Sequence, residues 1–593
     1  MDSDHHRRKR SPILSRRKLL LPCLSFFAFL VFVSPDCSFP LPPVPSSSLP
    51  SSFSTSRSLL QRLGRPDRSI RPPRLLVRDR VLFPDHVLLL VDSLLCPSHL
   101  LDCVYSGLTF SNSSEDERRR DLVLVEAALS VDGYGETGSV VRCPLPTPNS
   151  SFSPAADLRW RGGRDQDGRP SGVADAVLHN WEKLVYEAVV DGDTAVVFVK
   201  GLNLRPHRRS DPSPFTCHFG LKGEMTKAVS AAQEVIRCLL PRSVREANPA
   251  ETLGDRVMIG VSHGSGRRAP VRDLIPSVAR LVVSNRYSQE RILRRKNRLC
   301  ACTMVWNQAQ FLREWILYHA WLGIERWFIY DNNSDDSTGE VIEELDSRGY
   351  NITRHSWPWI KTQEAGFSHC SLRAREECEW VGFFDVDEFF YLPYPTRNHK
   401  TLGIPGRGSL KSMVANISSS RKVAEIRTSC HSFGPSGLTA RPPLGVTVGY
   451  TCRMQQPERH KSIVRTDAVD LSLLNEVHHF RLRDGYRYVN MPESVALVNH
   501  YKYQAWETFR SKFFRRVSTY VADWREHQNA GSKDRAPGLG TEAIEPADWR
   551  LRFCEVWDTQ LRDFVMDNLA EPSTRTLPWQ MIPPPPPPPV VVV

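Results

Sequence analysis

The sequence predicts an α/β fold for the C-terminal half of the chain, preceded by a β-rich accessory domain and an N-terminal apolar segment. Three observations lead to this prediction. Residues 19–33 form an apolar run directly after a basic one. Residues 61–270 contain short β-type runs separated by Pro, Gly and Ser. From residue 295 onward, strand-like and helix-like runs alternate, which is the order of a doubly wound, Rossmann-like sheet.

The N-terminus has the layout of a membrane anchor. Arg7–Arg10 and Arg16–Lys18 precede the apolar run Leu19–Val33. We predict a transmembrane signal anchor at 19–33, with the basic tail 1–18 in the cytosol, which makes a single-pass type II membrane protein. A cleaved signal peptide is the alternative. Residues 34–60, rich in Pro and Ser, are expected to form a stem leading into the secretory lumen.

Charge and cysteine content agree with that location. The net charge is +12, part of it in the basic tail, and no basic stripe with interleaved aromatic residues follows, which argues against a nucleic-acid partner. The chain has 14 cysteines, and those beyond the anchor can form disulfides in an oxidising lumen. Their connectivity cannot be read from the sequence. Cys370 and Cys378 are too far apart on one predicted helix to pair with each other.

The region 61–270 is predicted to be a separate β-rich domain. Val87–Val91, Leu122–Val125 and Thr194–Val199 are short β-type runs bounded by turn residues. The pattern is typical of a β-sandwich accessory module. A carbohydrate-binding role and a structural role as lid or spacer are both open.

The region 295–570 is predicted to be the catalytic domain, and 571–593 a disordered tail because it contains the run Pro583–Pro589. The expected elements of the catalytic domain are the strand Leu299–Trp306, the helix Gln308–Leu322 closed by Gly323, the strand Arg326–Tyr330, a helix from the N-cap Ser337 to Arg348, the strand Tyr350–His355, the helix Phe367–Glu379 and a strand over Trp380–Phe390.

The last of these strands carries the most informative motif. Asp385 and Asp387 follow an apolar run, and alternation along a strand is expected to direct both carboxylates to the same side. Ligands of open α/β sheets bind outside the carboxyl ends of the strands, and two carboxylates there can bind a divalent cation that holds a diphosphate. The motif therefore indicates a nucleotide-sugar transferase. A strand end with solvated acids is the alternative.

A set of short motifs runs through roughly residues 295–525. They are Cys300-Ala-Cys302, Asn307, Phe311–Trp315, Tyr318-His319, Gly323, Tyr330–Asn332, Trp357-Pro358, Gln363, His369-Cys370, Asp385–Phe389, Lys461–Val464, Val477–Phe480 and Asn499–Tyr501. Taken together, these motifs resemble glycosyltransferase family 92, and in particular its plant branch.

The resemblance implies a GT-A fold, a Golgi type II membrane protein and a divalent metal, usually Mn²⁺. Plant relatives of this kind are β-1,4-galactan synthases that use UDP-galactose. The expected function is therefore the metal-dependent, inverting transfer of a hexose, galactose above all, from a UDP-sugar to a glycan or cell-wall polysaccharide. The alternative is a lumenal carbohydrate-binding or scaffold protein with a non-catalytic transferase-like domain. Whether the chain forms a homodimer is left open.

Within this framework, residues can be assigned to the metal and the donor. Asp385 and Asp387 are expected to bind the metal together with His500, for which a structural role is the alternative. Asp331 and Asn307 are expected at the donor, although Asp331 equally suits a turn. Glu388 is either a partner of the metal ligands or a salt-bridged structural acid. Three basic residues could contact phosphate or lie on a solvated helix face: Lys502, Arg510 and Lys512.

An inverting transferase also needs a general base near the acceptor hydroxyl. Glu476, Glu493 and Glu364 are candidates, and the sequence does not choose among them. His478 and His479 lie on an apparent strand, and we expect them to be packing residues. We expect the same of Trp357 and Trp359, for which stacking on a sugar ring is the alternative.

Overall fold

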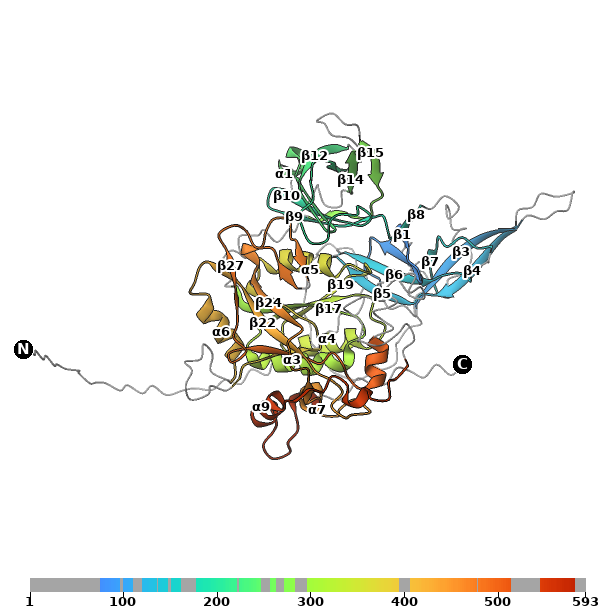
Figure 1. Cartoon of the computed structure of the whole chain (residues 1–593). Coiled ribbons are helices and arrows are strands. Elements are labelled where there is room, and N and C mark those ends of the chain that lie inside the picture. The colour runs from blue at the N-terminus through green and yellow to red at the C-terminus, as the bar shows by residue number, and fades with distance from the viewer. Residues whose placement is uncertain are drawn as a thin grey trace, which may run out of the picture. The chain divides into compact units, whose positions relative to one another are not determined.

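The computed structural model describes residues 75–95, 100–109, 120–135, 137–147, 151–161, 177–220, 223–246, 256–262, 271–282, 296–393, 406–476, 478–512 and 544–581 (Figure 1). The predicted basic tail (1–18), signal anchor (19–33) and stem (34–60) lie outside these ranges, as does the polyproline run. Among the helices of the described ranges, none has the length and apolar character needed to cross a membrane.

The β-rich region consists of two separate units. In the first, a five-stranded sheet packs on a three-stranded one around a shared core, and Cys103 and Cys143 form a disulfide inside it. The larger sheet has the order β5 (Ser130–Tyr134), β6 (Gly138–Pro144), β2 (His86–Val91), β1 (Val77–Leu82), β8 (Leu178–Asn180), and the smaller one β4 (Arg120–Ala127), β3 (Leu101–Thr109), β7 (Asp157–Trp160). We call this unit the first β-module.

The second unit, here the second β-module, is a curled eight-stranded sheet with its own core and the disulfide Cys217–Cys238. Its order is β15 (Val271–Ile275), β14 (Val257–Ser262), β11 (Phe215–Phe219), β12 (Glu224–Ala232), β13 (Val235–Leu239), β10 (Thr194–Val199), β9 (Val185–Asp191), β16 (Leu281–Val282), with the short helix α1 (Arg242–Glu246) after β13. Its strands continue to Val282, beyond the predicted boundary at 270. A single accessory domain was expected, and the structure has two modules.

The C-terminal half contains the predicted α/β sheet. Its parallel half has the order β19 (Ile352–Ser356), β18 (Arg326–Asp331), β17 (Asn297–Val305), β20 (Cys378–Phe383). The sheet continues with β24 (Arg459–Arg465), β22 (Val423–Ser432), β28 (Leu497–His500) and β21 (Glu388–Tyr391), and β27 (Arg487–Asn490) pairs with β22. The alternation of α3 (Ala309–Leu322), α4 (Thr338–Ser347) and α5 (Gln363–Ala374) with the parallel strands confirms the predicted Rossmann-like order.

Shorter elements complete this half. They are α6 (Ser409–Ile417), α7 (Val446–Gly449), α9 (Gln560–Asn568), the paired strands β23 (Cys452–Arg453) and β29 (Val556–Trp557), the paired strands β25 (Asn475–Glu476) and β26 (His479–Phe480), and the 3₁₀ turns η4 (Thr466–Ala468), η6 (Trp549–Leu551) and η7 (Pro578–Gln580). Residues 571–581, predicted to be disordered, are instead ordered here. Leu577 is buried in the core, and Trp579 Nε1–H donates to the carbonyl of Leu444 at 3.0 Å.

Local chemistry explains where the helices begin and end. Gly323 closes α3 as predicted, with a left-handed φ of 105°, which glycine adopts without steric cost. Ser337 precedes α4, but its side chain does not cap the helix as predicted. The carboxylate of Asp336 does so instead, because its Oδ1 accepts the N–H of Thr338 at 3.0 Å. The helix α5 ends at Ala374 and not at Glu379, since β20 begins at Cys378.

Strand alternation on β17 divides the core of this half into two. Leu299, Ala301 and Val305 face the cluster formed with α3 and α4. Cys300 and Cys302 face the opposite cluster, where they form disulfides with Cys378 and Cys370. Cys370 and Cys378 thus each pair with another cysteine and not with each other, as predicted. A further disulfide joins Cys452 to Cys554, and Cys430 is the one free thiol of the described ranges.

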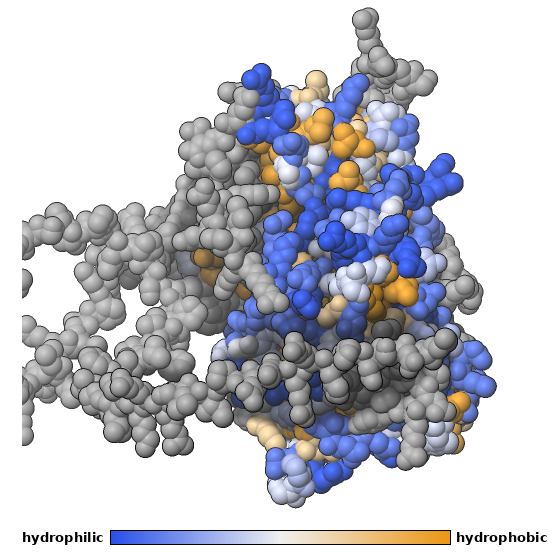
Figure 2. Space-filling view, turned by 90° about the vertical axis from the view of Figure 1, so that its left-hand side faces the viewer, coloured by the Kyte–Doolittle hydropathy of each residue, from blue (hydrophilic) through white to orange (hydrophobic). Residues whose placement is uncertain are grey.

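The second cluster is shared with both β-modules. Phe83 of the first module and Tyr186 and Phe198 of the second pack in it beside Trp357 and Trp359. The β-modules therefore cover one face of the α/β sheet together with α5. The surface in Figure 2 is largely hydrophilic, with hydrophobic residues gathered in small separate groups.

Candidate active site

Three carboxylates gather in the turn between β20 and β21. The N–H of Glu388 donates to the carbonyl of Asp385 at 3.1 Å, and the N–H of Asp385 donates to Oε2 of Glu388 at 2.9 Å. The prediction that Asp385 and Asp387 share one face of a strand is therefore wrong, because these hydrogen bonds close a tight turn. The acids still converge: oxygens of Asp385, Asp387 and Glu388 lie within 4.8 Å of one another. We call these three residues the acidic turn.

A buried lysine neutralises the innermost carboxylate. Lys461, on β24, places Nζ 2.7 Å from Oε1 of Glu388 and 3.5 Å from Oδ2 of Asp385. Burial lowers the pKa of Lys461, but the two carboxylates outweigh burial and raise it, so the ammonium stays charged. Glu388, which is fully buried, is thus a salt-bridged acid that also holds the turn.

The carboxylate of Asp387 faces two basic groups. Nε2 of His500 lies 3.4 Å from Oδ2 of Asp387, and Nζ of Lys512 contacts the same oxygen. Burial raises the pKa of Asp387, but Lys512 and then His500 lower it by more, so the pKa lies well below its usual range. In this structure Lys512 thus supplies cationic charge directly at Asp387.

His478 faces the remaining acid of the turn. Its Nε2 lies 3.5 Å from Oδ2 of Asp385, and its ring is only 3% exposed. His478 has a left-handed φ of 77°, which is rare outside glycine and places the residue just before β26. Burial raises the pKa of Asp385, but Lys461 and His478 lead the charges that hold it well below its usual range. His478 is buried, as a packing residue would be, but it also contacts Asp385 of the acidic turn, which the sequence analysis did not predict.

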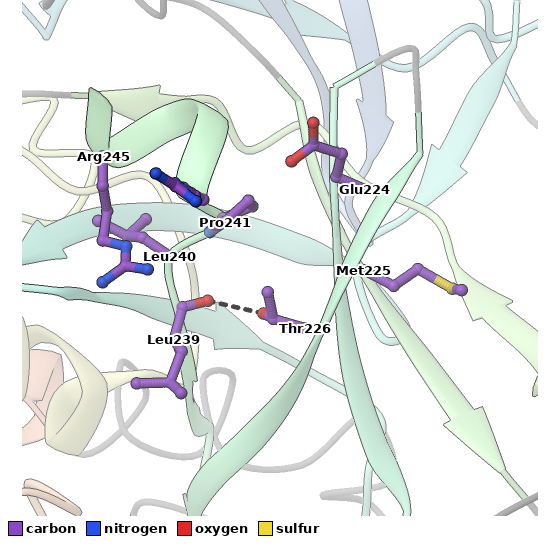
Figure 3. A pocket seen from close by; sticks show the side chains of 8 residues that line it. Glu224, Met225, Thr226, Leu239, Leu240, Pro241 and Arg245 are labelled. Carbon is purple, nitrogen blue, oxygen red and sulfur yellow. Dashed lines mark hydrogen bonds between the residues drawn. The ribbon is translucent and has the colours of Figure 1, made fainter. Parts of the chain in front are cut away.

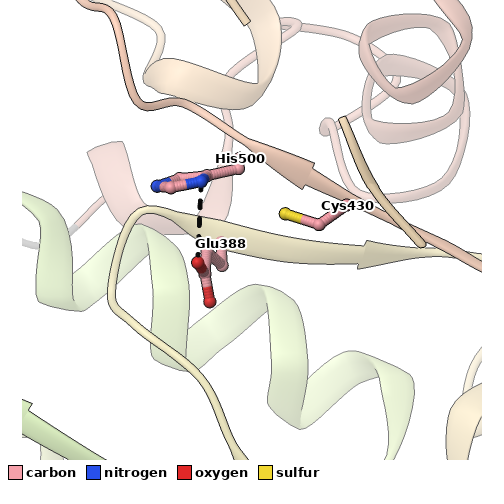
Figure 4. Close-up of side chains that lie close together, drawn as sticks. All are labelled: Glu388, Cys430 and His500. Carbon is pink, nitrogen blue, oxygen red and sulfur yellow. Dashed lines mark ion pairs between the residues drawn. The ribbon is translucent and has the colours of Figure 1, made fainter. Parts of the chain in front are cut away.

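His500 joins two groups of side chains. It pairs with Glu388 across β28 and β21, and Nδ1 of His500 lies 3.7 Å from Oε1 of Glu388 (Figure 4). The thiol of Cys430, on β22, lies beside both. Burial, with a further contribution from Glu388, raises the pKa of Cys430 well above its usual value, so the group is a neutral thiol and a poor metal ligand.

Asp385 and Asp387, with His500 beside Asp387, offer ligand atoms of the kind that a divalent cation takes. Carboxylate oxygens are the ligands that hard cations prefer, and neutral imidazole binds transition ions such as Mn²⁺ as well. Nε2 of His500 is buried, has no hydrogen-bond partner among the described residues and lies beside the Asp387 carboxylate. An imidazole nitrogen that makes no hydrogen bond and lies beside a carboxylate suits a metal-ligand role. Glu388 is fully buried and ion paired with Lys461, whereas the side chains of Asp385 and Asp387 are 27% and 11% exposed.

Asp331 and Asn307 hold the loops that follow the first two parallel strands. Oδ1 of Asp331 accepts the N–H of Ser334 at 2.9 Å, which is the turn role considered from the sequence. Oδ2 of Asp331 accepts Nε–H of Arg354 at 2.7 Å. Asn307, with φ of 53°, accepts the N–H of Asp335 at 2.9 Å on its Oδ1. Both residues lie at carboxyl ends of strands, the edge where ligands of such sheets bind.

The basic residues that follow His500 differ in what they contact. Nζ of Lys502 lies 2.9 Å from Oε2 of Glu458, which also accepts the hydroxyl of Ser432 at 2.7 Å. Lys502 is thus ion paired within the protein, next to His500 in the sequence. Arg510 lies 3.9 Å from Glu507 on a largely exposed surface. Of the three, only Lys512 contacts the acidic turn.

The structure brings none of the general-base candidates into hydrogen-bond or ion-pair contact with the acidic turn, as far as the described residues go. Glu476 is exposed and pairs with His207 at 2.8 Å. Glu493 pairs with the buried His431 at 3.1 Å, and Glu364 is exposed on α5. Gln363, the neighbour of Glu364, places Nε2 3.5 Å from Oδ1 of Asp385.

Trp357 and Trp359 are packing residues, which is the role that the sequence favoured for them. They are 0% and 2% exposed, so neither ring is available to stack on a sugar. Nδ2 of Asn332 donates to the carbonyls of both, at 2.6 and 3.1 Å.

A shallow groove of about 430 Å³ lies far along the chain from this site, on the second β-module. It runs between β12, the end of β13 and α1, and the hydroxyl of Thr226 donates to the carbonyl of Leu239 across it at 2.7 Å (Figure 3). Its lining is Glu224, Met225, Thr226, Leu239, Leu240, Pro241, Arg242 and Arg245. None of these residues has an aromatic ring on which a sugar could stack.

The sequence missed Lys461, His478 and Gln363 as neighbours of the acidic turn. All three belong to the motifs of the family resemblance, so the sequence marked them as residues of interest. It did not show where they lie in the fold. Lys461 reaches the turn through the antiparallel pairing of β24 with β20, and His478 through its own left-handed backbone conformation.

Comparisons with known proteins agree with the class that the fold and the acidic turn indicate, which is a glycosyltransferase. The sequence profile of glycosyltransferase family 92 matches residues 295–536. A glycosyltransferase family 92 protein of Ricinus communis is 56% identical over 581 residues, 95% of this chain and 95% of the relative. One of Arabidopsis thaliana is 52% identical over 96% of this chain and 95% of its own length.

The chain therefore belongs to glycosyltransferase family 92, and the resemblance drawn from the motifs is confirmed. A galactan β-1,4-galactosyltransferase of Arabidopsis thaliana is 29% identical over 175 residues, 27% of this chain and 33% of that protein. Among solved structures, a mannosyltransferase of Pyrobaculum calidifontis in complex with GDP-mannose and Mn²⁺ covers 39% of this chain and 64% of its own at 12% identity. Its TM-score of 0.22 is too low to support an argument.

Proposed function

We propose that this glycosyltransferase moves a hexose, galactose in the first instance, from a UDP-sugar to a glycan or cell-wall polysaccharide in a metal-dependent, inverting reaction. The observation that carries the proposal is the acidic turn, with the unpartnered Nε2 of His500 beside Asp387. Galactose and a plant polysaccharide acceptor are favoured by the similarity to the Arabidopsis galactan galactosyltransferase.

In this proposal Asp385, Asp387 and His500 hold the cation. When bound, the cation neutralises charge on the diphosphate of the donor and on the departing nucleotide. The protein prepares this site in two ways. Lys461 balances Glu388 and so keeps the turn folded, and the depressed pKa values of Asp385 and Asp387 keep both carboxylates ionised.

Lys512 has a separate role in the proposal. Its ammonium lies on Asp387 in this structure. A flexible lysine at that position can turn from the carboxylate to a phosphate oxygen of the donor once Asp387 has another cationic partner. We propose that the nucleoside part of the donor binds at the edge of the sheet where Asp331 and Asn307 hold the loops after β18 and β17. For Lys502, paired with Glu458, we propose a supporting contact next to His500.

The general base is proposed among Glu476, Glu493 and Glu364, each of which would deprotonate the acceptor hydroxyl. Glu476 precedes His478 by two residues, and Glu364 follows Gln363, so both are adjacent in sequence to contacts of the acidic turn. The Gln variant of the true base should lose kcat while its KM for the donor stays unchanged.

We further propose that the protein resides in the Golgi membrane as a type II protein anchored through residues 19–33, with its catalytic domain in the lumen. The motifs of the N-terminal sequence and five disulfides within the described ranges support an oxidising compartment. N-terminal sequencing of the mature protein tests this, because a start after Val33 would identify a cleaved signal peptide.

A donor screen tests the proposed reaction. The full chain is assayed for release of UDP from a panel of UDP-sugars with mixed glycan acceptors and Mn²⁺, with and without EDTA. We expect EDTA-sensitive turnover of one donor, UDP-galactose, by the wild type. The same absence of UDP release in wild type and Asp387→Asn, with every donor and acceptor, would refute the proposal.

A further inference from the structure

One arginine connects the first β-module to the loop at the end of β18. Nε–H of Arg354 donates to Oδ2 of Asp331 at 2.7 Å, and Nη2–H donates to Oδ1 of Asp132, on β5, at 2.8 Å. The side chain of Asp331 is 1% exposed and that of Asp132 18%. Arg354 is thus held between two carboxylates, one from each part of the protein.

The arginine controls what Asp331 can do. Both oxygens of Asp331 are used within the protein, because Oδ1 accepts the N–H of Ser334 and Oδ2 accepts from Arg354. Arg354 therefore fixes the rotamer of Asp331, and Asp331 in turn fixes the loop that begins at the carboxyl end of β18. Arg354 lies on β19, the edge strand of the sheet, and Asp132 is the acidic partner that fixes its far side.

The first β-module is fixed at this junction and is not merely tethered to it. The ring of Trp359 lies 6.3 Å from Phe83 and 6.4 Å from Tyr134, between ring centroids. Tyr134 is two residues from Asp132 on β5. Buried aromatic packing of this kind holds Asp132 in a defined position, which a flexibly attached module would not do.

We propose that Asp132 and Arg354 are positioning residues for the sugar-nucleotide donor, so that the first β-module completes the donor site. Asp132 holds Arg354, Arg354 holds Asp331, and Asp331 fixes the loop at the carboxyl end of β18, against which the nucleoside part of the donor binds in the proposed function. This inference rests on the proposed function, because that function places the donor at this edge of the sheet. It assigns the module a role in donor affinity in place of glycan capture.

The test compares four variants of the full chain, one of which is the conservative Asp132→Glu. Asp132→Asn removes the outer carboxylate, and Arg354→Lys keeps the charge but loses the two-sided geometry. The matched control is Asp191→Asn, because Asp191 also joins the modules to the α/β half, through Arg375 at 2.7 Å, but at the end of α5. Each variant is characterised by kcat, by KM for donor and for acceptor, by calorimetric Kd for UDP with Mn²⁺, and by Tm.

We expect Asp132→Asn and Arg354→Lys to raise the donor KM and the Kd for UDP about fivefold or more, which corresponds to roughly 1 kcal/mol. Acceptor KM should stay unchanged, and Asp132→Glu should restore part of the affinity. Asp191→Asn should lower Tm without changing donor KM. A merely structural role would lower Tm in all variants and leave the ratio of donor KM to acceptor KM constant.

Three results would overturn the inference, and the first two leave the proposed function standing. If the wild type turns over a UDP-sugar and Asp132→Asn keeps its donor KM within about twofold, only the inference fails. The inference fails in the same way if Asp191→Asn raises donor KM as much as Asp132→Asn. If the wild type neither binds UDP nor releases it from any UDP-sugar, the proposed function fails and the inference with it.

Discussion

The side chains at the acidic turn are arranged so that its carboxylates stay ionised although they are buried. Lys461 balances Glu388 at 2.7 Å, and His500 and Lys512 face Asp387. Two like charges in a buried site repel and raise each other's pKa unless opposite charges compensate them. The compensation keeps Asp385 and Asp387 ionised together, as the proposed metal site requires.

We expect Asp387→Asn to lower kcat by about 10²–10³-fold, because the amide removes one of the charged ligands that the proposed reaction needs. The protein should remain folded, because Asn has the shape of Asp and the Glu388–Lys461 ion pair of the turn is kept. UDP release measures the activity, and far-UV circular dichroism the fold. His500→Ala is the companion variant, and should shift the Mn²⁺ titration to higher concentrations. Turnover of Asp387→Asn at the wild-type rate would exclude the metal role.

Lys461→Met should destabilise the protein by about 3–5 kcal/mol, because it leaves the fully buried Glu388 carboxylate without its partner. Lys411→Met is the matched control. It removes a lysine from an ion pair with Glu325, whose two side chains are 38% and 31% exposed, and should cost less than about 1 kcal/mol. Chemical denaturation gives both free energies of unfolding. Equal losses in the two variants would show that burial of the Glu388 pair has no special cost.

Periodicity and turn residues predicted most of the parallel half of the sheet. The runs around Cys300, Trp327 and Ile352 are strands β17, β18 and β19, and the helix before Gly323 ends where glycine indicated. The segment around Asp385 was predicted to be one continuous strand, because apolar and aromatic residues lie on both sides of its carboxylates. Hydrogen bonds between Asp385 and Glu388 break that run into β20, a turn and β21, which no local pattern distinguishes.

The neighbours of the acidic turn were harder to predict for a related reason. Lys461 reaches the turn through the pairing of β24 with β20, two strands that are distant in the sequence. His478 reaches it through its left-handed backbone in the short turn between β25 and β26. Asp385 and Asp387 were predicted as metal ligands because they follow an apolar run, and His500 was predicted from the family resemblance. Asp132 carried no such signal, since its contact with Arg354 joins residues that are 222 positions apart.

Strand β9 carries a carboxylate whose ionisation should change the stability of the junction. Glu187 accepts hydrogen bonds from the hydroxyl of Tyr134 and from Nε1 of Trp359, the latter at 3.4 Å. Burial is the largest influence and raises the pKa of Glu187 from 4.5 to about 6, against the hydrogen bonds and Arg78, which lower it. The folded protein therefore binds this proton more tightly than the unfolded chain.

It follows that acidification stabilises the fold through Glu187. As the pH falls from above 6 towards 4.5, the free energy of unfolding should rise in the wild type relative to Glu187→Gln, by about 1–2 kcal/mol. The measurement is the difference in free energy of unfolding between the two proteins at pH 7.5 and at pH 5. A difference that is the same at both pH values, or that moves in favour of the variant on acidification, would contradict this.

At the scale of the described molecule, one hydrophobic core is shared by the two β-modules and the α/β half. Trp357 and Trp359, from the α/β half, are buried against Phe83, Tyr186 and Phe198 of the two β-modules. Each large apolar side chain contributes roughly 1.5–3 kcal/mol when buried, while a domain is stable by only about 5–15 kcal/mol. Residues 296–581 expressed alone should therefore lack cooperative unfolding.

Secretion yield, near-UV circular dichroism and limited proteolysis of residues 296–581 check this expectation against the full chain. The comparison also bears on the accessory role considered from the sequence. A separable carbohydrate-binding module would leave a folded transferase behind when deleted. A truncated protein that unfolds cooperatively and still turns over a UDP-sugar would show that the shared core is dispensable.

The two disulfides on β17 have a consequence for how the chain can be produced. Cys300 and Cys302 lie on one face of the strand, and their partners Cys378 and Cys370 follow some 70 residues later. Four cysteines allow three pairings, so chain synthesis alone does not select the native one. A bacterial cytosol would leave all four as thiols, and an oxidising host without a disulfide isomerase would trap exchanged pairs. Expression in a eukaryotic secretory host is therefore the practical route to active protein.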